Sequence, residues 1–203
     1  ELILHPMVEE IKEAVGSMGD DTPAAVLSNQ YRPLSHFFKQ NFSQVTNPPI
    51  DSLRENEVMS LKTRFGNLGN ILDFENLTKD NIHVLESPIL SNSQFEKFIA
   101  FFKDNLKILD CTFDVQSNLK KRLGQLCSEA ENAVREGYKH LILSDKKISE
   151  KKAAIPMILA FGAINSKLVN LGIRGFVSIN VQTGEVLDTH SFAVLLGVGT
   201  TTI

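Results

Sequence analysis

Candidate catalytic groups lie at or near the carboxyl ends of the predicted strands of this chain. They are Asp114, Ser144, Asp145, Asn180 and Gln182. In sheets of parallel strands, the carboxyl ends of the strands meet at one edge and usually carry the reactive side chains. The same residue types also cap helices, and the Gln182-Thr183-Gly184-Glu185 segment has the composition of an ordinary turn. Catalysis and local capping therefore both stay open as interpretations.

Two glycine-containing segments suggest phosphate binding through backbone amides. Segment 16–23 lacks the following lysine and the upstream strand of a phosphate loop, and its Asp20 and Asp21 would repel an anion. The Gly197-Val198-Gly199 segment lacks the third glycine of a dinucleotide loop and does not follow a first strand. We interpret segment 16–23 as a tight turn and expect no nucleotide site at either segment.

The histidines and cysteines do not have the spacing of a metal site. The histidines are His5, His36, His83, His140 and His190. Cys111 lies in a predicted buried strand and Cys127 lies beside Leu126 on a helix face, so we expect both to be small core residues. Two cysteines cannot form a disulfide framework, which favours a reducing compartment.

The charge balance argues against a nucleic-acid partner. The 203 residues include 21 basic and 24 acidic ones, giving a net charge of −3. The Lys146-Lys147 and Lys151-Lys152 pairs are expected to form a solvated face. No apolar run reaches the roughly 18 residues of a membrane span. The chain opens at Glu1 without a methionine and closes on an apolar end, so we expect it to be a piece of a longer protein.

The elements that would position these groups alternate between strands and helices from residue 82 onward. Predicted strands cover residues 82–85, 108–113, 140–143 and 176–181, with another beginning near Thr200. Predicted helices cover residues 93–106, 117–136, 153–171 and 191–196. This alternation predicts right-handed βα units with parallel strands. The number of units is too small to close a barrel, so an open α/β sheet and an incomplete TIM-barrel-like sheet both remain possible.

The first third of the chain, residues 1–81, is predicted to be helices and loops. Apolar residues recur at helical spacing in segments 7–15, 34–45 and 51–65. Pro48 and Pro49 end the second of these helices, because prolines remove hydrogen-bond donors and push the preceding residue out of helical geometry. We predict one domain over residues 1–203, with this helical part preceding the βα units of residues 82–203.

Several long, irregular strings in the chain resemble the central domain of the glutamate synthase large subunit. They are GSMGDDTP at 16–23, AVLS at 25–28, QVTNPPIDSLRE at 44–55, ESPIL at 86–90, LILSD at 141–145, AIP at 154–156 and HSFAVLLG at 190–197. The resemblance covers nearly the whole chain and is weakest over the first fifteen residues.

The resemblance implies a non-catalytic domain that joins two catalytic ones. In the family, an N-terminal amidotransferase domain with a cysteine nucleophile releases ammonia from glutamine, and a domain carrying FMN and an iron-sulfur cluster uses it with 2-oxoglutarate to make glutamate. The central domain is similar to a degenerate flavin barrel and helps to wall an ammonia tunnel. The residues carried over for the tunnel are Thr46, Asn47, Pro48, Pro49 and Ile50.

The tunnel residues have a physical rationale and an alternative. A rigid proline loop offers backbone carbonyls to neutral ammonia, and Ile50 helps to exclude water; the alternative is that the loop only packs between helices. Asp51 and Arg54 are expected to be a helix cap and a local ion pair.

The resemblance also implies the setting of the domain. It implies no cofactor in this domain, FMN and an iron-sulfur cluster elsewhere in the parent, and the flanking domains as partners. A small electron-transfer subunit or ferredoxin is a further implied partner, with neither nucleic acid nor membrane. The implied location is the cytoplasm, or the plastid stroma in a photosynthetic eukaryote.

The chain departs from the family pattern at three places. Ile164-Asn165-Ser166-Lys167 stands where relatives often have a histidine cluster, and His190-Ser191 stands where they tend to have paired histidines. Gly197-Val198-Gly199-Thr200 stands where they tend to have Gly-Tyr-Gly-Ala. Either a common chemistry does not strictly require those positions, or this member has compensated for the changes. Two other interpretations stay open: a stand-alone α/β enzyme using Asp114, Asp145 and Asn180, and a regulatory ligand-binding module.

Overall fold

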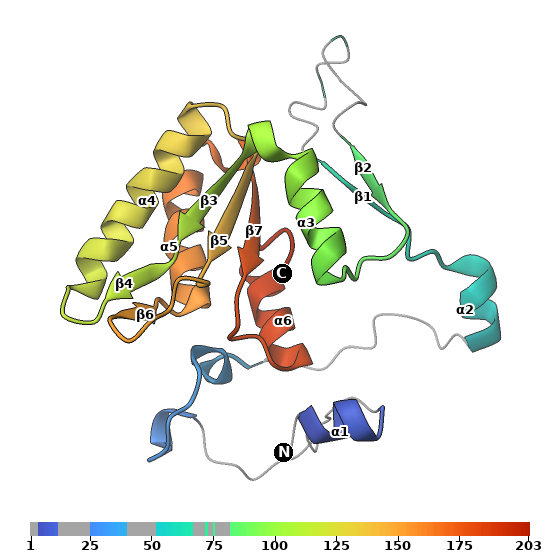
Figure 1. The fold of residues 1–203 in the computed structure, drawn as a ribbon, viewed down its shortest axis with the longest axis horizontal. Coiled ribbons are helices and arrows are strands. Elements are labelled where there is room, and N and C mark those ends of the chain that lie inside the picture. The colour runs from blue at the N-terminus through green and yellow to red at the C-terminus, as the bar shows by residue number, and fades with distance from the viewer. Residues whose placement is uncertain (1–3, 12–24, 40–51, 67–71, 73–74, 76–81) are drawn as a thin grey trace.

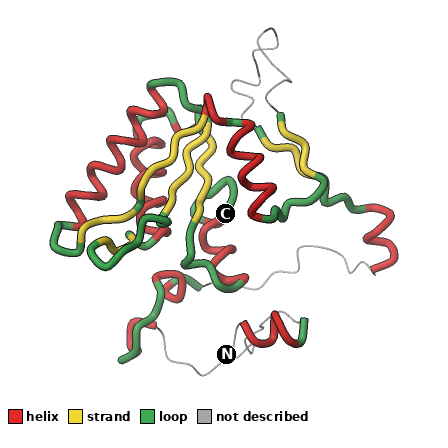
Figure 2. The backbone as a smooth tube through the Cα atoms, viewed as in Figure 1, coloured by secondary structure: helices red, strands yellow, loops and turns green. Residues whose placement is uncertain are grey.

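A three-stranded parallel sheet forms the centre of the molecule. The computed structural model describes residues 4–11, 25–39, 52–66, 72, 75 and 82–203. Strands β3 (Leu106–Asp110), β5 (His140–Ser144) and β7 (Ser178–Gln182) lie side by side in sequence order (Figure 1, Figure 2). The predicted α/β class with parallel strands is confirmed, and the described strands do not close into a barrel.

The predicted last strand begins beside β7. Thr202 forms a parallel bridge with Asn180, and the Thr202 carbonyl accepts a hydrogen bond of 2.9 Å from the Val181 amide. The Thr201 amide donates to the Ile179 carbonyl at 2.8 Å. The sheet therefore continues in sequence order past β7, in the sense expected of consecutive βα units.

Two helices cover one face of the sheet and enclose the main core. Helices α4 (Leu119–Arg135) and α5 (Met157–Asn170) pack on each other and on the strands. Alternate strand residues such as Leu141, Leu143 and Ile179 join this core, because side chains of a strand alternate between its faces. The Asn118 side chain caps the first turn of α4 by accepting a hydrogen bond from the Lys121 amide.

The other side of the sheet carries a smaller layer, built from helix α3 (Asn92–Phe101) and the antiparallel pair β1 (Thr63–Phe65) and β2 (His83–Leu85). Figure 1 shows α3 and α4 on opposite sides of the sheet. Phe65 and Phe102 pack against the His140 ring of β5, with ring centroids 5.3 and 4.4 Å away. Phe98 completes this small aromatic core. Residue 140 alternates with Leu141, so this core lies on the face turned away from α4 and α5.

Predictions for the first third of the chain were partly wrong. Helix α1 spans Leu4–Glu9, so it starts before the predicted residue 7, and Ile11, with a φ of 53°, is not helical. Residues 12–15 of this prediction lie outside the described residues. Segment 34–45 begins with only a 3-10 turn, η2 (Leu34–Phe37), because Phe38 is extended. Helix α2 (Ser52–Val58) stops short of 65, and strand β1 follows. The alternation of Thr63, Arg64 and Phe65 has the period of a strand, and only Phe65 of the three is buried.

The larger corrections to the predicted βα units concern two strands and one helix. The strand predicted at 82–85 exists as β2, but it pairs antiparallel with β1 outside the parallel sheet. The strand predicted at 108–113 divides into β3 and β4 (Thr112–Asp114), and β4 pairs antiparallel with β6 (Lys152–Ala154). Helix α5 consequently begins at Met157 instead of 153, after Pro156. By contrast, α6 (Thr189–Gly197) confirms the short helix predicted at 191–196.

Three 3-10 turns complete the described elements. Turn η1 spans Ala25–Leu27, η4 spans Lys103–Asn105 and η5 spans Arg174–Phe176. The predicted helix 93–106 therefore ends at Phe101, followed by η4, and the predicted strand 176–181 begins only at Ser178.

Candidate functional site

The carboxyl ends of the three parallel strands bring polar side chains together at one edge of the sheet. Asp110, Ser144 and Gln182 are paired in register as the last residues of β3, β5 and β7. The Ser144 hydroxyl donates a hydrogen bond of 2.9 Å to the Gln182 side-chain oxygen. Two members of the predicted catalytic set, Ser144 and Gln182, thus bind each other directly.

Asp145 is buried and binds the neighbouring loop through one carboxylate oxygen. Its Oδ2 accepts hydrogen bonds from the Thr183 hydroxyl at 2.5 Å and the Gly184 amide at 3.1 Å. These contacts tie the loop after β5 to the loop after β7, across a separation of 38 residues in sequence. The Asp145 carboxylate therefore holds two loops together, which supports the capping interpretation over the catalytic one.

Asp114 and Asn180, the other two members of the predicted set, lie elsewhere. Asp114 ends β4 in a different sheet, is exposed, and accepts a hydrogen bond of 2.9 Å from the Gln116 amide in a local turn. Asn180 is buried inside β7, where its amide donates to the Leu141 carbonyl at 3.1 Å and its oxygen accepts from the Thr202 hydroxyl at 2.8 Å. The structure does not bring Asp114, Asp145 and Asn180 together as a catalytic group.

Asp110 is the strand-end residue that the sequence analysis missed. Its carboxylate accepts hydrogen bonds from the Thr112 amide at 3.0 Å and the Thr112 hydroxyl at 2.7 Å, and lies 3.5 Å from the Lys147 ammonium. Partial burial opposes ionisation, but Thr112, Lys147 and Lys152 outweigh it and hold the pKa of Asp110 below its usual value. The predicted strand ran through residue 113, which hid Asp110 in its interior. Ending that strand at its first acidic residue would have revealed it.

Glu185 supplies the cap that helix α5 lacks locally. Pro156 precedes the helix and provides no side-chain cap. Instead, the Glu185 carboxylate accepts a hydrogen bond of 2.7 Å from the amide of Met157, the first residue of α5. Burial of this carboxyl group raises its pKa above the usual value, although the Met157 amide favours the ionised form. No local sequence signal indicates this contact, because the partners are 28 residues apart.

Every helix that follows a strand of the parallel sheet has its amino end filled by the chain itself. Glu185 binds the first amide of α5, Asp188 accepts hydrogen bonds from the Ser191 amide and hydroxyl in α6, and Asn118 caps α4. In barrel and doubly wound folds, such helix ends at the carboxyl edge commonly bind a phosphate. Two carboxylates at these positions would repel one, so this edge does not fit an FMN phosphate.

The two cysteines do not fit an iron-sulfur cluster either. A cluster needs several accessible thiolates. Cys111 is fully buried, and burial raises the pKa of its thiol to about 12. Cys127 packs against the main core from α4. The structure thus confirms the prediction for Cys111, whereas Cys127 is half-buried and only packs against the core. No group of three His, Cys, Asp or Glu residues in the described ranges is placed to hold a metal ion.

A polar junction connects η2 to α6. The His190 ring donates a hydrogen bond of 2.9 Å from Nε2 to the Ser35 carbonyl, and the hydroxyls of Ser35 and Ser191 lie 3.5 Å apart. Hydrogen bonds from Ser191, helped by His190 and His36, outweigh partial burial and hold the pKa of Asp188 below its usual value. A cavity of about 20 Å³ lies beside this junction and is room for one water-sized molecule, not for an organic substrate.

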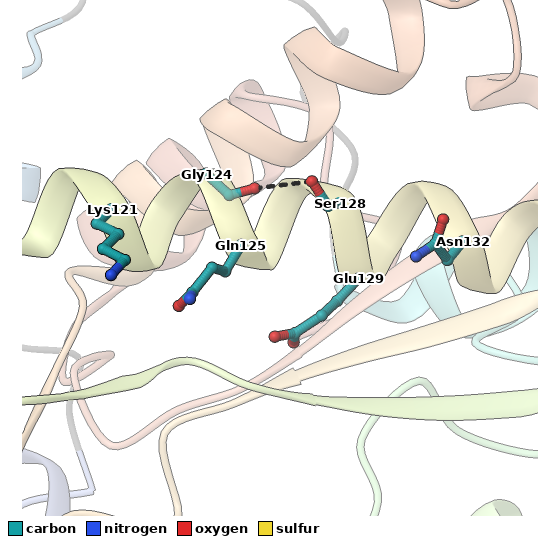
Figure 3. A pocket seen from close by; sticks show the side chains of 6 residues that line it. All are labelled: Lys121, Gly124, Gln125, Ser128, Glu129 and Asn132. Carbon is teal, nitrogen blue, oxygen red and sulfur yellow. Dashed lines mark hydrogen bonds between the residues drawn. The ribbon is translucent and has the colours of Figure 1, made fainter.

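The outer face of α4 carries a shallow, open depression. Figure 3 shows its lining side chains along the helix: Lys121, Gly124, Gln125, Ser128, Glu129 and Asn132. Charged and amide groups alternate there, as on a solvent-facing helix. It contains none of the strand-end residues and no nucleophile paired with a base.

The tunnel residues Thr46, Asn47, Pro48, Pro49 and Ile50 lie outside the described residues, as do segment 16–23 and Asp51. Arg54 is in α2. Gly197, Val198 and Gly199 form the end of α6, with Gly199 at a φ of 109°, so they terminate a helix rather than open one. Across the described part of the chain, no helix combines the length and apolar content needed to cross a membrane.

Comparison with known proteins identifies the family. A family model described as the glutamate synthase central domain matches residues 1–203. The chain belongs to the glutamate synthase central domain family. It is 56% identical over 206 residues to the glutamate synthase [NADPH] large chain of Azospirillum brasilense, a match that covers 100% of this chain and 14% of the relative.

The names of two further relatives state different electron donors. The chain is 39% identical over 209 residues to the chloroplastic ferredoxin-dependent glutamate synthase of Spinacia oleracea, covering 100% of this chain and 13% of the relative. It is 40% identical over 196 residues to the glutamate synthase [NADPH] large chain of Bacillus subtilis, covering 97% of this chain and 13% of the relative. This central domain therefore spans about a seventh of the length of these relatives.

Proposed function

We propose that this domain is a non-catalytic scaffold within a glutamate synthase large chain. It would span residues 1–203 as one domain and join a glutamine amidotransferase domain to a domain carrying FMN and an iron-sulfur cluster. The observation that carries this proposal is the self-capped carboxyl edge of the sheet. Glu185, Asp188 and Asn118 fill the helix ends where a catalytic relative would bind a phosphate, and Asp145 is engaged with Thr183.

The chemistry in this proposal lies in the flanking domains of the same polypeptide. FMN and the iron-sulfur cluster belong to those domains, and electrons arrive from a small subunit or from ferredoxin. The parent enzyme would work in the cytoplasm, or in the plastid stroma of a photosynthetic eukaryote. The names of the Azospirillum brasilense and Spinacia oleracea relatives support this range of settings.

The second part of the proposal concerns the path of ammonia. Segment 46–50, Thr-Asn-Pro-Pro-Ile, lines a route for ammonia between the two catalytic domains. Two consecutive prolines fix the backbone and leave carbonyl groups without competing amide donors. Ile50 keeps water, which would protonate ammonia, out of the route.

The test uses the full-length enzyme with Ile50→Trp. A bulky ring in a narrow route should slow ammonia transfer, so the glutamine hydrolysed per glutamate formed should rise above the wild-type ratio. Activity with added ammonium salt should stay within about twofold of wild type, a change of only about 0.4 kcal/mol in the activation free energy. The matched control is Ile89→Trp, at a residue that is 81% exposed in this domain. An Ile50→Trp enzyme with wild-type coupling would contradict the tunnel assignment.

A further inference from the structure

Helix α6 has an unusual outer face for a surface helix. Its sequence, THSFAVLLG, contains no Asp, Glu, Lys or Arg. Ser191 and Leu195 point into the molecule and are buried, whereas Phe192 is 44% exposed and Leu196 is 52% exposed. These two residues are four apart and share one face of the helix. Beyond its first turn the helix presents only apolar residues, and such a face is normally covered.

Exposed apolar residues also lie on the N-terminal segment that packs beside α6. Turn η2 packs on α6 and η1 packs on η2, and the contact between His190 and Ser35 fixes this arrangement. Figure 1 shows the part of this segment that contains η2 near the lower end of α6, with η1 farther from the helix. We define the α6 apolar surface as Phe192 and Leu196 together with Val26, Leu27, Tyr31 and Phe37, which are between 50% and 89% exposed. Arg32 is the single charged residue in segment 25–38.

The outer face of α4 shows how a solvated helix of this same domain is built. It presents Lys121, Gln125, Glu129 and Asn132 (Figure 3). Scattered apolar residues on a surface need no partner, but Phe192 and Leu196 lie on one face of a helix without charged residues, and further exposed apolar residues lie on the turns packed beside it. Exposed apolar residues grouped in this way are of the kind that marks an interaction site. Both faces belong to one domain with a net charge of −3, so the overall composition does not account for the difference between them. We attribute the difference to different roles of the two faces.

We propose that the α6 apolar surface is buried against another domain of the same polypeptide. This rests on the proposed scaffold function, in which the remainder of a glutamate synthase large chain flanks the domain. The relatives are about seven times longer than this chain, so most of the polypeptide lies outside it. A domain tethered to its neighbours meets them at a high effective concentration, which favours them over a second copy in solution.

The chemistry of the surface defines its partner. The opposing surface must be apolar at its centre, since a charge buried against Phe192 and Leu196 would be desolvated without a partner. Charged groups fit only at the rim, where Arg32 offers a site for a carboxylate. The partner is therefore an apolar patch of a neighbouring domain with an acidic margin.

The experiment places a photo-crosslinker in the full-length enzyme. Phe192 is replaced by p-benzoylphenylalanine, which keeps the ring at that position, and irradiated samples are digested and mapped by mass spectrometry. We expect cross-links within one polypeptide to peptides outside residues 1–203. The control carries the same crosslinker at Gln125 on the polar face of α4 and should give several-fold fewer products.

Every other outcome of the experiment would contradict the proposal. A cross-linked dimer on a denaturing gel would assign the surface to a second copy. Products confined to residues 1–203 would show that this domain covers the surface itself, and an absence of products would show that it is solvated. Hydroxyl-radical oxidation of the wild-type enzyme repeats the test without a variant: Phe192 and Leu196 should be oxidised more slowly than Ile148, which is 57% exposed.

The tunnel assignment and the docking surface can be contradicted independently of each other. Wild-type coupling in the Ile50→Trp enzyme would remove the tunnel assignment and leave the cross-linking result unaffected. A solvated Phe192 would remove the docking surface while leaving the coupling result in place.

Discussion

At the scale of single residues, the domain uses carboxylates as caps and fasteners. Glu185, Asp188 and Asp145 each accept hydrogen bonds from backbone amides at the ends of helices and loops. Such groups also appear in active sites, and their residue types alone do not separate the two roles. The partners do: each of these carboxylates binds donors of its own chain, which is how a structural carboxylate lowers the free energy of the folded state.

Glu185 offers the sharpest test of this role. Glu185→Ala should lower the free energy of unfolding by about 1 kcal/mol, because the first amide of α5 loses its acceptor. Glu185→Gln keeps an oxygen in the same place and should remain within about 0.5 kcal/mol of wild type. Urea denaturation followed by circular dichroism measures both. If the two variants were equally destabilised, the negative charge rather than the hydrogen bond would be the important feature.

At the scale of elements, Arg174 connects three parts of the fold. Its guanidinium donates to the Asn165 side chain in α5 at 2.8 Å, to the Val177 carbonyl before β7 at 2.6 Å, and to the Gly199 carbonyl after α6 at 3.1 Å. Gly199 lies just before Thr201 and Thr202, which extend the sheet. Arg174 therefore fixes the position from which the next strand of the sheet starts.

Replacing Arg174 should destabilise this part of the molecule most. Arg174→Ala should lower the free energy of unfolding by about 2 kcal/mol, since hydrogen bonds from a charged donor are lost in a partly buried place. Amide hydrogen exchange at Val181 and Thr201 should also become faster. The control is Arg135→Ala, which breaks an exposed pair with Glu131 and should cost at most about 0.5 kcal/mol. Equal effects of the two changes would contradict the connecting role.

The sequence predicted the elements with strong periodicity and missed those defined by pairing. Helices α4 and α6 and strands β5 and β7 lie close to their predicted positions, because each carries a clear apolar pattern between clear breaks. Strand β1 is three residues long and is defined by its pairing with β2. The break at Cys111 is hidden in a continuous run of β-forming residues. Likewise, the contact between Glu185 and Met157 depends on two loops that only the folded sheet brings together.

At the scale of the whole molecule, His140 joins the two layers that flank the sheet. Its ring packs against Phe65 and Phe102 of the smaller layer, while its neighbour Leu141 lies in the main core. Its Nδ1 is buried and lacks a hydrogen-bond partner among the described residues. Burial, with a smaller contribution from Lys139, lowers the pKa of His140 from 6.5 to about 4. Protonation of this ring is therefore disfavoured while the two layers are packed around it.

The stability of the chain should depend on this histidine at mildly acidic pH. Between pH 6.5 and about 4 the unfolded state binds a proton at this position and the folded state does not, so stability is highest above 6.5 and falls as the pH is lowered. His140→Phe suits the aromatic cluster and should remove this part of the pH dependence. Denaturation midpoints from pH 4 to 8 measure it. The exposed His5, replaced in the same way, should leave the slope as in wild type, and a wild-type slope in His140→Phe would contradict the prediction.

The junction between η2 and α6 has a consequence for the order of assembly. Ser35 and His190 are 155 residues apart in sequence, whereas neighbouring strands of the sheet are joined by single βα connections. Closing a long loop costs more chain entropy than closing a short one, and local connections are made first. The βα units can therefore assemble in order along the chain, and segment 25–38 attaches to α6 only after α6 itself is in place. A part of the chain near its beginning thus completes its fold last.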